Sequence, residues 1–104
     1  MKKVIRDGLV AVLYTKRYGA GWSTWYNEEY PEILFDPVVV DALEKGLVLS
    51  EIEGYLEDTY PNGFFEGYRT LGIEWVKQGT DIYISEYDGL ECVATKNSKT
   101  WHTV

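Results

Sequence analysis

The sequence has few of the residues that disulfide and metal chemistry require, since its 104 residues include one cysteine and one histidine. The single Cys92 excludes a disulfide within the chain, and one Cys with one His supplies too few ligands for a structural zinc site. No apolar run approaches the ~18 residues of a membrane-spanning helix, and the N-terminus lacks the features of a signal peptide. We therefore expect a cytoplasmic protein with no metal, no cofactor and no membrane partner.

Basic residues are also few, because ten Lys and Arg stand against 17 Asp and Glu, a formal charge of −7 at pH 7. Such a chain is not expected to bind nucleic acid directly, since phosphates are neutralised by basic surface. The acidic residues are concentrated between Glu28 and Glu66, a stretch with eleven carboxylates and one lysine. These carboxylates are either the solvated faces of helices or an acidic surface that meets a basic partner.

Apolar and aromatic residues are plentiful. The hydrophobic fraction is 45%, with nine Tyr, four Trp and three Phe. A chain of this composition can offset its ordering entropy by burial, so it should fold. The length predicts one domain over residues 1–104.

Three segments in the first two thirds of the chain carry clear structural signals. Leu9–Tyr14 is a short apolar run that suits a central strand buried on both faces. Asp36 and Pro37, followed by apolar residues up to Lys45 and Gly46, predict a helix with an Asp cap. Ser50 and Glu53 form the pattern of a capping box, and the second helix that it begins should end at Pro61-Asn62-Gly63.

The last third of the chain predicts strands. Ile73–Lys77 alternates in polarity, and the Asp88-Gly89 dipeptide between Asp81–Tyr87 and Leu90–Thr95 is typical of a two-residue hairpin turn. Thr100–Val104 could add an edge strand. The fold class is therefore α+β, with an N-terminal central strand, two short helices and then a C-terminal antiparallel β-meander.

The segment from Lys16 to Tyr26 gathers two cations, two glycines, two hydroxyls and four aromatic rings directly after the central strand. Glycines let backbone N–H groups approach an anion, hydroxyls and cations bind phosphate oxygens, and aromatic rings stack on a nucleobase. The G-x-G spacing is neither a dinucleotide fingerprint nor a P-loop. The alternative is a tight turn whose tryptophans cap the core. The candidate ligand-binding residues are Lys16, Arg17, Gly19, Gly21, Trp22, Ser23, Thr24, Trp25 and Tyr26.

No catalytic set is specified by spacing. Cys92 with His102, or Ser23 with His102 and an Asp, can be drawn as nucleophile and base, but a Cys on a strand is more often a small hydrophobe. Glu86 or Asp88 could serve as a base beside the same loop, although turn chemistry explains both. We expect no catalytic residues and no enzymatic activity.

Two segments carry a resemblance. Gly19–Trp25 (Gly-Ala-Gly-Trp-Ser-Thr-Trp) and the late Glu86-Tyr-Asp-Gly element resemble small uncharacterised proteins of tailed phages and prophages. The resemblance covers both ends of the chain, and it brings no assigned activity with it. It implies a small acidic accessory protein that inhibits or diverts a system of the bacterial host, in whose cytoplasm it would act.

Two functions follow as hypotheses. The first is a counter-defence protein that sequesters a small nucleotide-like ligand without chemistry, in a pocket formed by Gly19–Tyr26 and completed by a second copy of the chain. The alternative is an acidic protein–protein inhibitor whose Glu28–Glu66 region engages a host defence or nucleic-acid-binding protein. The second hypothesis predicts steep weakening of association with salt.

Overall fold

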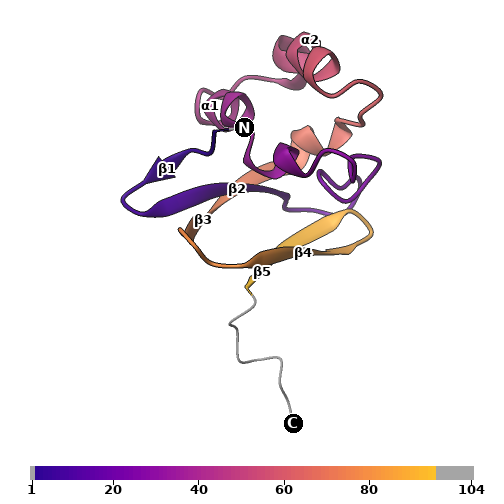
Figure 1. Ribbon diagram of the computed structural model, residues 1–104. Helices are drawn as coiled ribbons and strands as arrows, with labels where there is room; N and C mark the ends of the chain where they lie inside the picture. Colours follow the sequence, from indigo (N-terminus) through magenta and orange to yellow (C-terminus); the bar gives the residue numbers. More distant parts are fainter. Residues whose placement is uncertain (1, 96–104) are drawn as a thin grey trace.

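The computed structural model describes residues 2–95 and confirms the α+β class (Figure 1). All of its strand pairs are antiparallel. Thr100–Val104 and His102 lie outside the described residues. In chain order the elements are β1 (Ile5–Arg6), β2 (Leu9–Thr15), the 3-10 helix η1 (Pro31–Phe35), α1 (Pro37–Glu44), α2 (Leu49–Thr59), the 3-10 helix η2 (Glu66–Thr70), β3 (Leu71–Lys77), β4 (Ile82–Tyr87) and β5 (Leu90–Thr95).

The expected central strand, β2, lies between β1 and β3 in a three-stranded sheet. Its register places Leu13 opposite Ile73 and Thr15 opposite Leu71. The three C-terminal strands are divided between two sheets, because β3 pairs with β2 while β4 and β5 form a hairpin of their own. Both turn residues of this hairpin, Asp88 and Gly89, have positive φ, as the two-residue turn requires.

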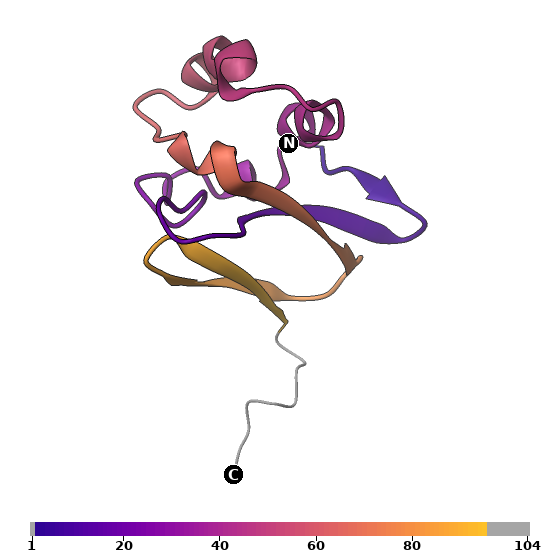
Figure 2. The ribbon, with the colours of Figure 1, turned by 180° about the vertical axis from the view of Figure 1, so that it is seen from behind.

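The elements stack in three layers, with α1 and α2 on one side of the β1–β2–β3 sheet and the β4–β5 hairpin on the other (Figures 1 and 2). This arrangement explains why β2 is apolar at successive positions. Ala11 and Leu13 belong to the core shared with the helices, whereas Val10 and Val12 alternate onto the opposite face. A strand covered on both faces cannot alternate with polar residues.

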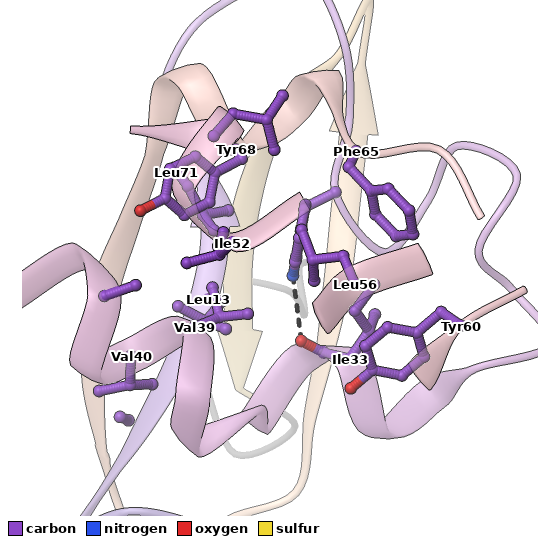
Figure 3. Close-up of a cluster of buried hydrophobic side chains, with 14 residues drawn as sticks. Leu13, Ile33, Val39, Val40, Ile52, Leu56, Tyr60, Phe65, Tyr68 and Leu71 are labelled. Carbon is purple, nitrogen blue, oxygen red and sulfur yellow. Dashed lines mark hydrogen bonds between the residues drawn. The ribbon is translucent and has the colours of Figure 1, made fainter. Parts of the chain in front are cut away.

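The core between sheet and helices is drawn in Figure 3, where Leu13 of β2 faces Val39 of α1 and Ile52 of α2. Aromatic side chains from loops complete it, among them Tyr60 and Phe65, whose ring centroids lie 6.5 Å apart. Burial of large apolar side chains is the main stabilising contribution in a domain of this size. No helix within residues 2–95 is both long enough and apolar enough to cross a membrane.

The two helices begin differently from one another. Asp36 caps α1 as expected, with Oδ1 accepting the N–H groups of Val38 at 2.8 Å and Val39 at 3.2 Å. The predicted Ser50 cap of α2 is wrong, because the helix already begins at Leu49, a core residue that is 4% exposed. The side chain of Glu51 reaches back to the N–H of Val48 at 3.0 Å, so a carboxylate still satisfies a free donor at this helix start.

Candidate functional site

A buried carboxylate, Glu91 on β5, organises the loop that was predicted to bind a ligand. Glu91 is 1% exposed. Its Oε1 accepts the N–H of Thr15 at 3.0 Å, and its Oε2 accepts the N–H of Trp22 at 2.9 Å and the hydroxyl of Thr24 at 2.7 Å. Hydrogen-bond donors of this kind replace the water molecules that a carboxylate loses when it is buried. The loop is an anion-binding cradle, and the anion that fills it is the protein's own side chain.

The glycines of the loop serve this same contact. A Cβ on Gly21 would lie 2.8 Å from Cδ1 of Trp25 and 3.1 Å from Oε2 of Glu91. Gly19 donates its N–H to the carbonyl of Asp88 at 2.8 Å, and a Cβ on Gly89 would lie 2.6 Å from the carbonyl carbon of Gly19. Gly21 and Gly89 therefore allow the loop to pack on the hairpin, whereas Gly19 contributes a backbone N–H that is engaged within the protein.

Trp22 is not placed to stack on a ligand, which corrects the role that the sequence suggested. Its side chain is fully buried, and its indole N–H donates to the carbonyl of Ile33 at 3.0 Å. The ring lies 6.2 Å from that of Phe65, inside the core. An indole with a satisfied N–H and covered faces contributes to stability. The alternative interpretation, in which this tryptophan caps the core, describes Trp22.

Trp25 and Tyr26 form an aromatic platform with Phe64 at the surface. The rings of Trp25 and Phe64 are stacked at 6.3 Å with an interplanar angle of 25°, and Tyr26 lies edge-on to Phe64 at 5.6 Å. Tyr26 is 72% exposed. A hollow of about 250 Å³ is lined here by Thr24, Trp25, Tyr26 and Glu28. Of the predicted site residues, the structure brings Thr24, Trp25 and Tyr26 together around one open space.

Tyr26 is held in a backbone conformation that bulky residues rarely adopt, with φ of +62°. Such a residue costs about 1 to 3 kcal/mol and persists where its surroundings fix it. The buried Asn27 does so: its amide N–H groups donate to the carbonyls of Trp22 and Phe64, both at 2.7 Å, and its oxygen accepts the N–H of Phe64 at 2.9 Å. The platform is thus positioned before any ligand arrives.

Glu86 on β4 fixes the other side of Trp25. Its Oε2 accepts the indole N–H of Trp25 at 2.9 Å and the backbone N–H of Gly89 at 2.8 Å. These two donors hold the pKa of Glu86 below its ordinary value, with the Trp25 bond the larger cause. A carboxylate so engaged is a weak base, which disfavours Glu86 as a catalytic base. Sequence reasoning missed the positioning roles of Glu86 and Glu91, although a two-residue turn at Asp88-Gly89 places the two carboxylates directly opposite each other, where each needs its own hydrogen-bond donors.

The cations of the loop lie apart from the hollow. Lys16 and Arg17 are exposed, and within residues 2–95 neither forms an ion pair. The alkyl chain of Lys16 packs over Gly72 of β3, where a Cβ would lie 2.6 Å from Cδ of the lysine. Neither cation lines the hollow. Ser23, which precedes Thr24 in the chain, is half-buried and does not line it either. Ligand phosphates would have to extend from the platform to reach Lys16 or Arg17.

Four exposed carboxylates, which we call the acidic surface, are Glu28 and Glu29 in the segment that follows the platform and Glu57 and Asp58 at the end of α2. The hydroxyl of Tyr30 donates to the carbonyl of Pro61 at 2.8 Å, and this bond brings the segment after Glu28 beside the end of α2. Burial raises the pKa of Tyr30, and the neighbouring Glu29 raises it further. The last turn of α2 has no basic residue to complement the helix dipole.

The predicted pairings of Cys92 or Ser23 with His102 are not tested, because His102 lies outside the described residues. Cys92 is exposed on β5 opposite Ser85, so it is not the packed small hydrophobe that its strand position suggested. Across residues 2–95, no three His, Cys, Asp or Glu side chains gather closely enough to hold a metal ion.

Comparison of the chain with known protein families, with curated proteins and with solved structures gave no match.

Proposed function

We propose that the protein binds a small nucleotide-like ligand without chemical turnover, on the aromatic platform of Trp25, Tyr26 and Phe64. The observation that carries this proposal is the exposed Tyr26 at positive φ, held beside a hollow of about 250 Å³ by buried hydrogen bonds. Exposed aromatic rings fixed in advance lose little entropy when a planar base stacks on them. Stacking on one such ring contributes about 1 to 3 kcal/mol per base.

Each residue of the site has a part in this proposal. Trp25 and Tyr26 stack on the base, and the carboxylate of Glu28 contacts its polar edge. The hydroxyl of Thr24 donates to Glu91 and can only accept from the base, and Arg17 or Lys16 meets phosphate. The hollow is open on one chain, so a second copy would enclose the ligand better. The phage resemblance implies an accessory protein that inhibits or diverts a system of the host, and in this proposal it does so by sequestering a nucleotide.

Substitution of Trp25 by leucine is expected to weaken ligand binding at least tenfold, because leucine keeps apolar bulk but removes the stacking surface. The measurement is native mass spectrometry of the intact protein with mono-, di- and cyclic nucleotides and NAD-derived nucleotides, followed by titration calorimetry with any that add mass. Arg17→Gln should also weaken binding of this ligand. The control is Lys45→Gln, which removes a cation that pairs with Asp41 on α1.

Tyr83→Leu, on β4, is the matched aromatic control and should bind as tightly as the unsubstituted protein. The proposal fails if no nucleotide adds mass at any concentration tested. It also fails if Trp25→Leu binds the ligand as tightly as Tyr83→Leu does.

A second candidate function is engagement of a basic protein through the acidic surface. It is favoured by the exposed Glu57 and Asp58 at the end of α2, where negative charge opposes the helix dipole and no cation compensates. A basic partner would relieve this cost on binding. Partners of this kind include host proteins that otherwise bind nucleic acid.

Charge reversal tests this second function. Glu57→Lys with Asp58→Lys should abolish capture of a basic host protein from lysate, and capture by the unsubstituted protein should fall steeply as salt rises from about 50 to 300 mM, because exposed charges are screened. Glu51→Gln with Glu53→Gln, one to two turns earlier on α2, is the control. Equal capture by the reversed and control proteins would exclude the acidic surface as the contact.

A further inference from the structure

A cleft on the hairpin side of the sheet is separate from the aromatic hollow and shares no lining residue with it. Its floor is the second face of the sheet, where Val10, Val12 and Val76 are 8%, 1% and 9% exposed. These valines do not belong to the core that the helices cover. Ile5 and Ile82 form apolar sides, and the space measures about 120 Å³. The two layers are therefore incompletely packed together at this point.

The mouth of the cleft is cationic in a protein that is acidic as a whole. Its lining includes Lys3 and Lys77 and no Asp or Glu. In the part of the chain that the structure describes, neither lysine forms an ion pair. The ammonium of Lys3 lies 4.3 Å from the centroid of the Phe35 ring, so that its charge is held over the cleft wall. Positive charge beside apolar walls favours the binding of an organic anion.

Polar groups at one end of the cleft add hydrogen-bond donors to its apolar and cationic lining. The cleft is lined here by Lys77 at the end of β3 and by Gln78, Gly79 and Thr80 in the connection to β4. The N–H of Thr80 donates to the carbonyl of Lys77 at 3.1 Å to close a turn. The amide of Gln78 and the hydroxyl of Thr80 are donors suited to a carboxylate. A few polar groups at the rim of an apolar concavity are typical of small-molecule sites.

We propose that this cleft binds a small aromatic carboxylate, with the ring on the valine floor and the carboxylate between Lys77, Gln78 and Thr80. The space of about 120 Å³ is slightly smaller than an apolar cavity of about 150 Å³ that holds benzene, so the ligand is limited to one ring whose carboxylate remains at the open mouth. The cations select the anion over its neutral analogue. The ring occupies the space that the sheet and the hairpin leave unfilled.

The test is titration of the full chain with phenylacetate, followed by amide chemical shifts in NMR. Shifts should be confined to residues around the cleft, including Val12, Val76 and Gly79. Benzyl alcohol has the same ring without the charge and should bind about three- to fivefold more weakly, which is the effect of one exposed ion pair. Lys77→Gln should weaken the binding of phenylacetate by a similar factor and leave the binding of benzyl alcohol unchanged.

Two control variants separate this site from the others. Lys45→Gln removes a cation that does not line the cleft, and Trp25→Leu removes part of the aromatic platform; both variants should bind phenylacetate as the unsubstituted protein does. The proposal is overturned if shifts are absent or scattered over the surface. It is also overturned if Lys77→Gln has no larger effect than Lys45→Gln, because the lysine would then not contact the carboxylate.

Discussion

Replacement of Glu91 by glutamine is expected to destabilise the protein by about 3 to 5 kcal/mol, a large share of the ~5 to 15 kcal/mol typical of a domain. The carboxylate accepts the N–H groups of Thr15 and Trp22 and the hydroxyl of Thr24 in a buried site. Glutamine offers one acceptor oxygen and turns an NH₂ group toward a backbone donor. At least one buried N–H would then have no acceptor.

Thermal unfolding followed by circular dichroism measures this effect, and a fall in midpoint on the order of 20 °C is expected. The control is Glu74→Gln, which removes the same charge from an exposed position on β3 and should change stability by less than about 0.5 kcal/mol. Hydrogen exchange adds a local readout, because the amides of Trp22 and Thr24 should lose protection first. Equal midpoints for Glu91→Gln and Glu74→Gln would show that the carboxylate does not hold the loop.

The fold was largely predictable from local signals. The apolar run at Leu9–Tyr14 marked a strand with two covered faces, and Asp36-Pro37 marked the start of α1, because a cap and a fixed φ act within a few residues. The Asp88-Gly89 turn was equally local. Division of the last strands between two sheets was not predictable, since it depends on β3 pairing with β2, about 60 residues earlier in the chain.

The site was predictable in composition and not in arrangement. The loop from Lys16 to Tyr26 has the residues of an anion site, and the structure does place a carboxylate against its N–H groups. That carboxylate is Glu91, which lies 69 residues after Trp22 and which no spacing rule connects to it. Of the two tryptophans in this loop, Trp22 is buried in the core and Trp25 is half-exposed. Only the tertiary packing distinguishes them.

These two facts restrict what the loop can do. Because Glu91 fills the cradle, a ligand phosphate cannot use the same N–H groups, so the proposed function assigns recognition to the outer surface at Trp25 and Tyr26. The internal anion gives the loop a fixed shape, with no ligand needed to order it. Loss of Glu91 should therefore weaken ligand binding as well as stability, whereas loss of Trp25 stacking should weaken binding alone.

Replacement of Asp36 by alanine is the second substitution with a large expected effect, about 3 to 5 kcal/mol of lost stability. The buried carboxylate caps α1, and its Oδ2 accepts the hydroxyls of Tyr55 at 2.7 Å and Tyr60 at 2.5 Å. Asp36→Ala removes the cap and leaves two hydroxyls without this acceptor. Asp36→Ser should recover about 1 kcal/mol, because serine restores the cap alone.

Alkaline pH reports on the same cluster. Burial, followed by the bond to Asp36, raises the pKa of Tyr55 to about 12, and the pKa of Tyr60 is raised for the same reasons. A raised folded-state pKa favours the protonated hydroxyl, so this stability is complete below pH 10 and declines as pH rises from 10 through 12. Urea unfolding at several pH values should show that decline, and it should be shallower in Asp36→Ser.

A double-mutant cycle separates the cap from the tyrosines. If the hydroxyls depend on Asp36, Tyr60→Phe costs more stability in the unsubstituted protein than in the Asp36→Ala background, because its hydrogen bond to Asp36 is already lost there. Equal costs in both backgrounds would mean that the hydroxyl of Tyr60 gains nothing from Asp36. The cluster joins α1 to α2, so its coupling energy measures how firmly the end of α2, and the acidic surface on it, is fixed to the rest of the fold.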